Sequence, residues 1–276
     1  MKNALALGSF DGVHLGHKAV LELPNGLRHI AVTFSVPPKF KSFESSLILT
    51  ENDKEMYFKE LGIDEIFSLD FEEIRNVEAL NFLDFLKNKF NPAFISFGFN
   101  YRFGKDALGD TKLLKDYCES NNIEYKCVNA VECEDGIISS TNIRKLLSDG
   151  MVSEASKLLY KPFSFCEKVI SGDKRGRTIG FPTINQRYPK ELVRLKFGVY
   201  KSKVLFDGKE YAGITDIGIR PTFETDYVIS ETYIKNFSGN LYGKNVRVVP
   251  IEFLREEMKF SSVEELKKQI TIDLKK

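Results

Sequence analysis

Two of the three histidines in this 276-residue chain lie close together near its start, in the stretch GSFDGVHLGHKAV at residues 8–20. The imidazoles of His14 and His17 can contact phosphate oxygens, and Gly16 between them lets the backbone approach a ligand. A helix after this turn would add free N–H groups and the positive end of its dipole. The spacing predicts a site that holds a triphosphate and stabilises the charge on a departing pyrophosphate. Taken alone, it also fits a histidine that only caps a helix.

Two further stretches suit the same chemistry. GFNYRFG at residues 98–104 follows a predicted strand and supplies the amide of Asn100 and the guanidinium of Arg102, with Gly104 allowing close approach. ISSTNIR at residues 138–144 places hydroxyls at a helix start and a guanidinium in its first turn, from Ser139, Ser140, Thr141 and Arg144. Helix starts of this kind bind polyphosphates well. In isolation the first also fits a turn-rich surface loop, and the second an ordinary N-cap.

A fourth stretch, SGDKRGRTIGFPTIN at residues 171–185, points to a second nucleotide site. Its glycines, Gly172, Gly176 and Gly180, allow a tightly approaching backbone, and Arg175 and Arg177 add positive charge. The pattern is not the P-loop G-x-x-x-x-G-K-[ST]. Pro182 precedes an extended segment in which Thr183 and Asn185 point to the same side and could offer two neutral oxygens to Mg²⁺. A glycine-rich hairpin loop is the alternative.

Composition limits the class of protein. Lys and Arg number 40 against 39 Asp and Glu, so the chain has no bulk attraction to nucleic acid or membranes. No apolar run reaches the roughly 18 residues of a membrane span, and the apolar run at the start is short for a secretory signal. The four cysteines lack C-x-x-C spacing, which predicts free thiols and no structural zinc. We expect a cytoplasmic protein.

Strand-like and helix-like segments alternate from residue 1 to about residue 160. Thr50 is expected to cap a helix over 51–61, and Asn76 one over 77–90. Strands are predicted at 3–10, 29–35, 65–71, 93–99 and 123–129. This alternation predicts a parallel sheet covered by helices on both faces, with ligands beyond the carboxyl ends of the strands.

The order of the predicted segments changes after about residue 160. Strand-like segments at 163–172, 198–218, 229–237 and 245–254 follow one another without helices between them, and Asp207-Gly208 is a hairpin signal. This half is predicted to be a small antiparallel barrel. A terminal helix begins at Ser262, where Glu265 completes a capping box. The predicted domains are residues 1–160 and 161–276.

The first three motifs, in this order, resemble the nucleotidylyltransferase superfamily, and more narrowly the adenylyltransferase half of the bacterial bifunctional riboflavin kinase/FAD synthetase family. That family's patterns are G-x-F-D-G-x-H-x-G-H, G-x-[DN]-[FY]-x-F-G and I-S-S-[ST]-x-I-R, and the chain contains all three. The glycine-rich stretch resembles the riboflavin kinase pattern G-R-x-x-G-F-P-T-A-N. The resemblance covers essentially the whole chain, with both modules in family order.

The resemblance implies a Rossmann-like parallel-sheet α/β nucleotidylyltransferase domain followed by a small antiparallel β-barrel riboflavin kinase domain with a terminal helix. It implies a bifunctional enzyme whose C-terminal domain phosphorylates riboflavin to FMN with ATP. The N-terminal domain would then adenylylate FMN to FAD and release pyrophosphate. The small-molecule substrates are riboflavin, FMN and ATP, and Mg²⁺ is the expected metal, held by Thr183 and Asn185.

The resemblance also implies individual roles. Glu231 stands where the family's general base removes the proton of the ribityl 5′-hydroxyl, and a carboxylate suits that task. The other residues expected to act in catalysis are His14, His17, Asn100 and Arg144. The residues expected to bind nucleotide or flavin are Gly8, Phe10, Gly16, Ser139, Ser140, Thr141, Gly176, Arg177, Gly180, Thr183, Asn185 and Arg255.

The chain departs from the family patterns in two stretches. FSVPP at residues 34–38 stands where the family usually has F-D-P-H-P, and Ile184 replaces the alanine of P-T-A-N. The first departure motivates one alternative, a monofunctional riboflavin kinase with a vestigial N-terminal domain. A flavin- or nucleotide-binding regulator without turnover, and a nucleotidylyltransferase for another substrate, are further alternatives.

Overall fold

The computed structural model describes residues 2–34, 46–134, 136–172, 175–220 and 227–275. Contacts divide the chain into two compact units. The first comprises Met1–Phe43, Leu49–Ser140 and Leu158–Tyr160, and the second comprises Glu44–Ile48, Thr141–Lys157 and Lys161–Lys276. Because each unit is built from three separate stretches of the chain, the division into residues 1–160 and 161–276 stays a prediction. In the described part of the chain, no helix has the length and apolar character needed to cross a membrane.

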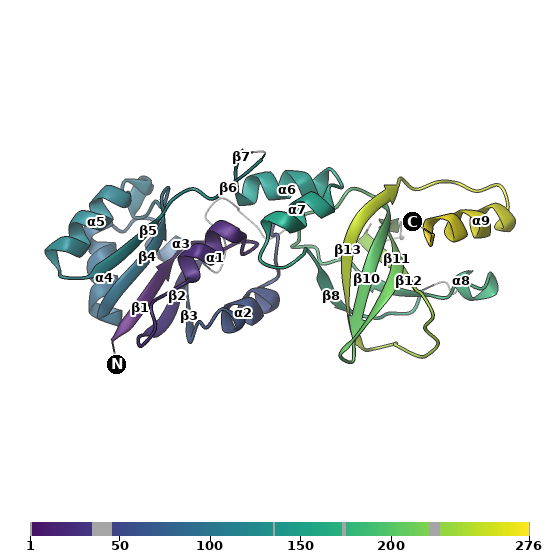
Figure 1. Cartoon of the computed structure of the whole chain (residues 1–276), viewed down its shortest axis with the longest axis horizontal. Coiled ribbons are helices and arrows are strands. Elements are labelled where there is room, and N and C mark those ends of the chain that lie inside the picture. The colour runs from purple at the N-terminus through teal and green to yellow at the C-terminus, as the bar shows by residue number, and fades with distance from the viewer. Residues whose placement is uncertain (1, 35–45, 135, 173–174, 221–226, 276) are drawn as a thin grey trace. The chain divides into compact units, whose positions relative to one another are not determined.

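The first unit contains a five-stranded parallel sheet with the strand order β3-β2-β1-β4-β5 (Figure 1). Its strands are β1 (Asn3–Leu7), β2 (Arg28–Phe34), β3 (Glu65–Leu69), β4 (Pro92–Gly98) and β5 (Glu124–Val128). All five predicted strands are confirmed, and so is the parallel α/β class of this half. The central strand β1 pairs with β2 and β4, so the loops that follow β1 and β4 open at the same edge.

Alternation along β1 assigns the helices to the two faces of the sheet. Leu5 and Leu7 belong to one buried cluster, and Ala6 between them belongs to another. Helices α1 (Leu15–Leu21) and α2 (Glu51–Glu60) pack on the Ala6 face, and α4 (Ala79–Phe90) and α5 (Thr111–Ser120) pack on the face of Leu5 and Leu7. The sheet is therefore covered on both sides, as the alternating pattern predicts.

Of the two helix caps predicted in the first half of the chain, one is right and one is wrong. The Thr50 side chain accepts a hydrogen bond from Asp53 N at 3.3 Å and caps α2. Asn76 does not cap α4, whose N-cap is Glu78. The short helix α3 (Phe71–Ile74) ends in a turn before α4, and Val77 in this turn accepts a backbone hydrogen bond from Lys105 N at 2.7 Å. This tertiary contact delays the start of α4.

Several short elements complete the fold. Between β4 and α5 lies the 3₁₀ turn η1 (Lys105–Ala107). A small hairpin of β6 (Glu132–Cys133) and β7 (Gly136–Ile137) precedes α6 (Ser140–Ser148) and α7 (Val152–Leu158). The second unit also contains α8 (Arg175–Thr178) within the glycine-rich stretch, and the terminal helix α9 (Val263–Asp273).

The second unit is built on a six-stranded antiparallel barrel with the strand order β8-β13-β10-β11-β12-β9 (Figure 1). Its strands are β8 (Phe165–Lys168), β9 (Thr183–Arg187), β10 (Gly198–Phe206), β11 (Lys209–Arg220), β12 (Tyr227–Ile234) and β13 (Asn245–Arg255). The predicted hairpin at Asp207-Gly208 joins β10 to β11, and both residues have positive φ. The predicted barrel with a terminal helix is confirmed.

A buried glutamine joins the two edge strands. Gln186 on β9 is fully buried, and its Nε2 donates to the carbonyl of Glu167 on β8 at 2.6 Å and to that of Val246 on β13 at 2.7 Å. Thr215 and Thr232 bond to each other through their hydroxyls at 2.9 Å, also buried. The barrel interior is thus partly polar, and the Gln186 side chain contributes to closure beside the backbone bond from Ile170 N to the Asn185 carbonyl at 2.8 Å.

We expect Gln186→Met to reduce the free energy of unfolding by about 1–3 kcal/mol, because buried carbonyls would lose their donor. Urea unfolding followed by circular dichroism measures this loss. Gln269→Met on α9 makes the same chemical change at a half-buried helix position and should cost less. Equal losses for the two variants would contradict this account of barrel closure.

Candidate functional sites

The turn after β1 has an unusual backbone. Phe10 and Val13 are non-glycine residues with φ of 51° and 41°, and both are fully buried. Phe10 packs edge-on against Phe58 with ring centroids 5.5 Å apart, and the Val13 carbonyl accepts a hydrogen bond from Tyr160 N at 3.0 Å. Core packing therefore holds a strained turn in one shape. Gly8 belongs to this construction, since a Cβ there would lie 3.0 Å from the Phe10 ring.

The two histidines of this turn stack on each other. Their ring centroids are 3.6 Å apart with 17° between the planes. His14 is the N-cap of α1, and its Nδ1 accepts a hydrogen bond from His17 N at 3.2 Å. A Cβ at Gly16 would lie 3.1 Å from Cε1 of His14, so this glycine makes room for the imidazole. The sequence predicts both histidines and the glycine but not this second use of Gly16.

The protonation of His14 follows from its surroundings. Burial lowers the pKa of His14 to about 4, so the ring is neutral at pH 7. Because Nδ1 accepts the bond from His17, the proton of the neutral ring is on Nε2. His14 can therefore offer a phosphate oxygen a neutral N–H donor rather than a positive charge.

The second motif lies at the same sheet edge, because it follows β4, the neighbour of β1. Leu7 and Phe97 are paired at the ends of these strands. Asn100 is exposed, and the Arg102 guanidinium lies 3.8 Å from the Asp110 carboxylate. Gly104 approaches protein rather than a ligand, since a Cβ there would lie 2.7 Å from Cα of Ala79.

The third motif contacts the first. Ser140 Oγ donates a hydrogen bond to the carbonyl of buried Asp11 at 2.9 Å. Ser139 is half-buried, and Thr141 is exposed on the first turn of α6. Arg144 Nε donates to the Ser46 carbonyl. The structure therefore brings ISSTNIR to the histidine turn through Ser140, whereas Arg144 holds the segment at residue 46.

Strand β9 carries the two oxygens proposed for magnesium. Thr183 and Asn185 are two residues apart and share one face of the strand. Asn185 is 6% exposed, and its Oδ1 accepts no hydrogen bond from the described residues. A Cβ at Gly172 would collide with the Asn185 amide, so this glycine leaves space around it. A buried amide oxygen without a donor, beside a threonine hydroxyl, fits a hard cation such as Mg²⁺.

The rest of the glycine-rich stretch folds into one helical turn. Gly176 lies in α8, where its carbonyl accepts from Phe181 N at 2.9 Å and a Cβ would collide with the Phe181 carbonyl. Gly180 has φ of +86° and open space around it. The Arg177 side chain lies outside the described part of the structure, as do Asp173 and Lys174.

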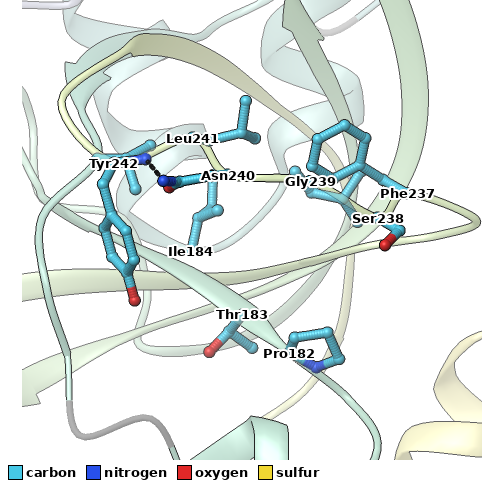
Figure 2. Close-up of a pocket in the computed structure, with 11 residues that line it drawn as sticks. Pro182, Thr183, Ile184, Phe237, Ser238, Gly239, Asn240, Leu241 and Tyr242 are labelled. Atoms are coloured by element: carbon cyan, nitrogen blue, oxygen red, sulfur yellow. Dashed lines mark hydrogen bonds between the residues drawn. The ribbon is translucent and has the colours of Figure 1, made fainter.

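A pocket of ≈ 300 Å³ opens beside Thr183 (Figure 2). Pro182, Thr183 and Ile184 line one side, and the segment Phe237–Tyr242 lines the other. Within that segment Tyr242 N donates to Asn240 Oδ1 at 3.0 Å. The pocket is of the size that small-molecule sites show and touches one proposed metal ligand.

Strand register places the proposed base next to the other proposed ligand. Glu231 on β12 is directly opposite Asn185 on β9, and Asp216 on β11 is directly opposite Glu231. Directly opposed residues share a face of the sheet, so the three form one row. Asp216 was not predicted from the sequence, where an isolated acid in an apolar strand gives no signal of its partners.

Arg255, predicted to contact flavin, is engaged with protein in this structure. Its Nε and Nη2 each lie 3.0 Å from Oδ2 of Asp273, which is 1% exposed. Its Nη1 donates to the Glu256 carbonyl at 3.1 Å. Arg255 therefore anchors α9 to the end of β13, and its contact with flavin stays a prediction.

Comparison with known proteins agrees with this division into two sites. Residues 1–142 match the FAD synthetase family model, and residues 159–276 match the riboflavin kinase family model. The chain belongs to the bifunctional riboflavin kinase/FMN adenylyltransferase family. It is therefore an enzyme with a riboflavin kinase half and an FMN adenylyltransferase half.

Relatives in this family match nearly the whole chain. The bifunctional riboflavin kinase/FMN adenylyltransferase of Listeria monocytogenes is 33% identical over 99% of this chain and 90% of its own length. That of Buchnera aphidicola is 34% identical over 99% and 92%. A crystal structure from Streptococcus pneumoniae, described as a macrolide-efflux protein, is 32% identical over 99% of this chain and 93% of its own, with a TM-score of 0.91.

The neutral state of His14 can be tested by nuclear magnetic resonance, because the chain has only three histidines. We expect the His14 signal of the ligand-free enzyme to titrate near pH 4, since burial disfavours the charged ring. A His14→Gln variant assigns the signal. Titration of His14 near its ordinary value of 6.5 would contradict the burial seen here.

We expect Gly172→Ala to lower the kinase rate by about 100-fold, because the new Cβ would displace the Asn185 amide. FMN formation from riboflavin measures this, and adenylylation of FMN by the same molecule should not change. Gly208→Ala, in the open β10–β11 turn, is the control for a glycine replacement that touches no site. Full kinase activity in Gly172→Ala would exclude Asn185 from the site as placed here.

Proposed function

We propose that the two halves carry out successive steps of flavin-cofactor synthesis. The barrel half transfers the γ-phosphoryl group of ATP to the 5′-hydroxyl of riboflavin, giving FMN and ADP. The α/β half transfers the adenylyl group of a second ATP to the FMN phosphate, giving FAD and pyrophosphate. The observation that carries the proposal is the presence of both family halves over nearly the full chain. The loops that carry the first two motifs follow neighbouring strands, and Asn185 is directly opposite Glu231, which supports it.

In the kinase half, the pocket beside Thr183 is the proposed site for ATP. Its wall of Ile184, Phe237 and Leu241 suits a nucleotide base, and Thr183 would lie at the phosphate end. Thr183 and Asn185 would hold Mg²⁺, which when bound neutralises charge on the phosphates. The two proposed ligands are on the face of the sheet that also carries Glu231 on the next strand. The phosphates of ATP and the Glu231 carboxylate would therefore meet on one side of the barrel.

Glu231 is the proposed general base. As the ribityl 5′-oxygen forms its bond to the γ-phosphorus, the bond from that phosphorus to the β-phosphate oxygen breaks. Glu231 takes the hydroxyl proton, and ADP leaves with the bridging oxygen. Its place directly opposite Asn185 supports this role, because strand neighbours put their Cβ atoms about 5 Å apart.

In the adenylyltransferase half, an FMN phosphate oxygen attacks the α-phosphorus of ATP, and pyrophosphate leaves. We propose that His14 donates a hydrogen bond from Nε2 to the ATP phosphates and that His17, stacked on it, is a second donor. Asn100, exposed after β4, and Arg144 remain the proposed groups that position nucleotide and leaving group. The cytoplasm is the proposed location, since both steps consume ATP.

The direct test is product chromatography after incubating the protein with riboflavin, excess ATP and magnesium. FMN followed by FAD supports both steps. FMN alone favours the alternative of a monofunctional kinase, in which the altered segment at 34–38 has abolished adenylylation. Residues 35–38 of that segment lie outside the described part of the chain. No FMN contradicts the proposal.

Separate variants should remove the two activities separately. Glu231→Gln is expected to lower FMN formation by about 10²–10⁴-fold, since it removes a general base, and to leave adenylylation of added FMN intact. His17→Ala is expected to lower FAD formation by about 10²–10³-fold and leave FMN formation intact. Rates for each step, measured with riboflavin or FMN as the starting substrate, decide this. Loss of both activities in either variant would contradict the assignment of one site to each half.

A further inference from the structure

Asp216 extends the row of functional side chains by one strand. The register runs from Asn185 on β9 to Glu231 on β12 and then to Asp216 on β11, without a bulge at either step. Adjacent strands lie about 4.8 Å apart, so Asp216 is one strand farther from the metal ligand than the base is. A substrate that reaches from the phosphates past Glu231 along this row would next meet Asp216.

One oxygen of Asp216 has no donor among the residues that the structure describes. Its Oδ1 is buried and accepts no hydrogen bond from the described residues. A buried carboxylate oxygen left without a donor is costly, and such groups in native structures usually have a partner that the protein alone does not supply. The Asn185 Oδ1 two strands away has the same property. Two acceptors without donors in a single row indicate a ligand surface.

The surroundings of Asp216 limit the charge of that ligand. Burial is the main cause that raises the pKa of Asp216 to about 6; the carboxylates of Glu257, Glu231 and Asp273 act in the same direction, and Arg255 opposes them. At neutral pH the group is an ionised acceptor in an acidic neighbourhood. This would repel the phosphates of ATP and favour a neutral molecule with hydroxyl donors. Of the substrates of the kinase half, riboflavin has this character, in its ribityl chain.

We propose that Asp216 accepts a hydrogen bond from a ribityl hydroxyl of riboflavin, and so selects flavins with a polyhydroxyl chain and aligns the 5′-hydroxyl with Glu231. The inference rests on the proposed kinase function of the barrel half. It assigns to β11 a part in substrate specificity beside the metal ligands of β9 and the base of β12.

Two flavins that differ only in the side chain test this. Riboflavin and lumiflavin, which has a methyl group in place of the ribityl chain, are titrated by flavin fluorescence with ADP and magnesium present. Asp216→Ala is expected to weaken riboflavin binding by about tenfold or more and to leave lumiflavin binding unchanged. Asp216→Asn keeps a neutral acceptor oxygen and should recover part of the loss. Glu210→Gln, on the exposed part of β11, is the matched control and should change neither affinity.

Steady-state kinetics of the same variants separate a role in riboflavin binding from a structural role. We expect Asp216→Asn to raise KM for riboflavin while KM for ATP and the adenylylation rate stay constant. Equal weakening of riboflavin and lumiflavin, or unchanged riboflavin affinity in an Asp216→Ala enzyme that still makes FMN, would overturn the inference. A wild-type protein that makes no FMN would instead overturn the proposed kinase function, and the inference with it.

Discussion

The strand register of β9, β12 and β11 is the constraint on which the kinase half depends. On these strands, the proposed site residues face outward, and the residues next to them face inward and close the barrel. Asn185, Glu231 and Asp216 make the outward row, and Gln186, Ser230 and Ile217 make the buried row beside it. A slip of one residue would exchange the rows and turn the proposed site residues into the interior. The two bonds from Gln186 to β8 and β13 hold β9 against such a slip.

In the adenylyltransferase half, the proposed site residues are positioned in a different way. A parallel sheet brings the loops after β1 and β4 to one edge regardless of their distance in sequence, but it does not fix the shape of either loop. The histidine turn is shaped instead by burial of Phe10 and Val13 in strained conformations and by the Ser140–Asp11 hydrogen bond. His14 caps the helix, and in the proposed site it is also a donor to phosphate, so the start of α1 and the proposed chemistry would be coupled.

The sequence predicts what local chemistry determines. The strand pattern, the caps at Thr50 and Ser262 and the Asp207-Gly208 turn follow from neighbouring residues, and the structure has all of them. Prediction from the sequence fails where a contact between residues far apart in the chain determines the local structure. Lys105 fixes the turn before α4 and so makes Glu78 the cap instead of Asn76. Close packing against Ala79 is the reason for glycine at position 104, and the Arg255 guanidinium is bound by Asp273. Asp216 lies in one row with Asn185 and Glu231 only because β11 pairs with β12. None of these partners can be identified from spacing along the chain.

The same alternation explains why isoleucine is compatible with the P-T-I-N stretch, where the family pattern has alanine. Ile184 is opposite Thr232, which is buried in the barrel, and packs against the cluster that contains Val169 and Ile234. Its added bulk therefore lies toward the core and the wall of the pocket, while Thr183 and Asn185 share the opposite side of the strand. The larger side chain adds buried apolar area near the proposed base-binding wall and leaves the space between the two oxygens as it was. The change to isoleucine is thus separated from the proposed metal ligands by the geometry of a strand.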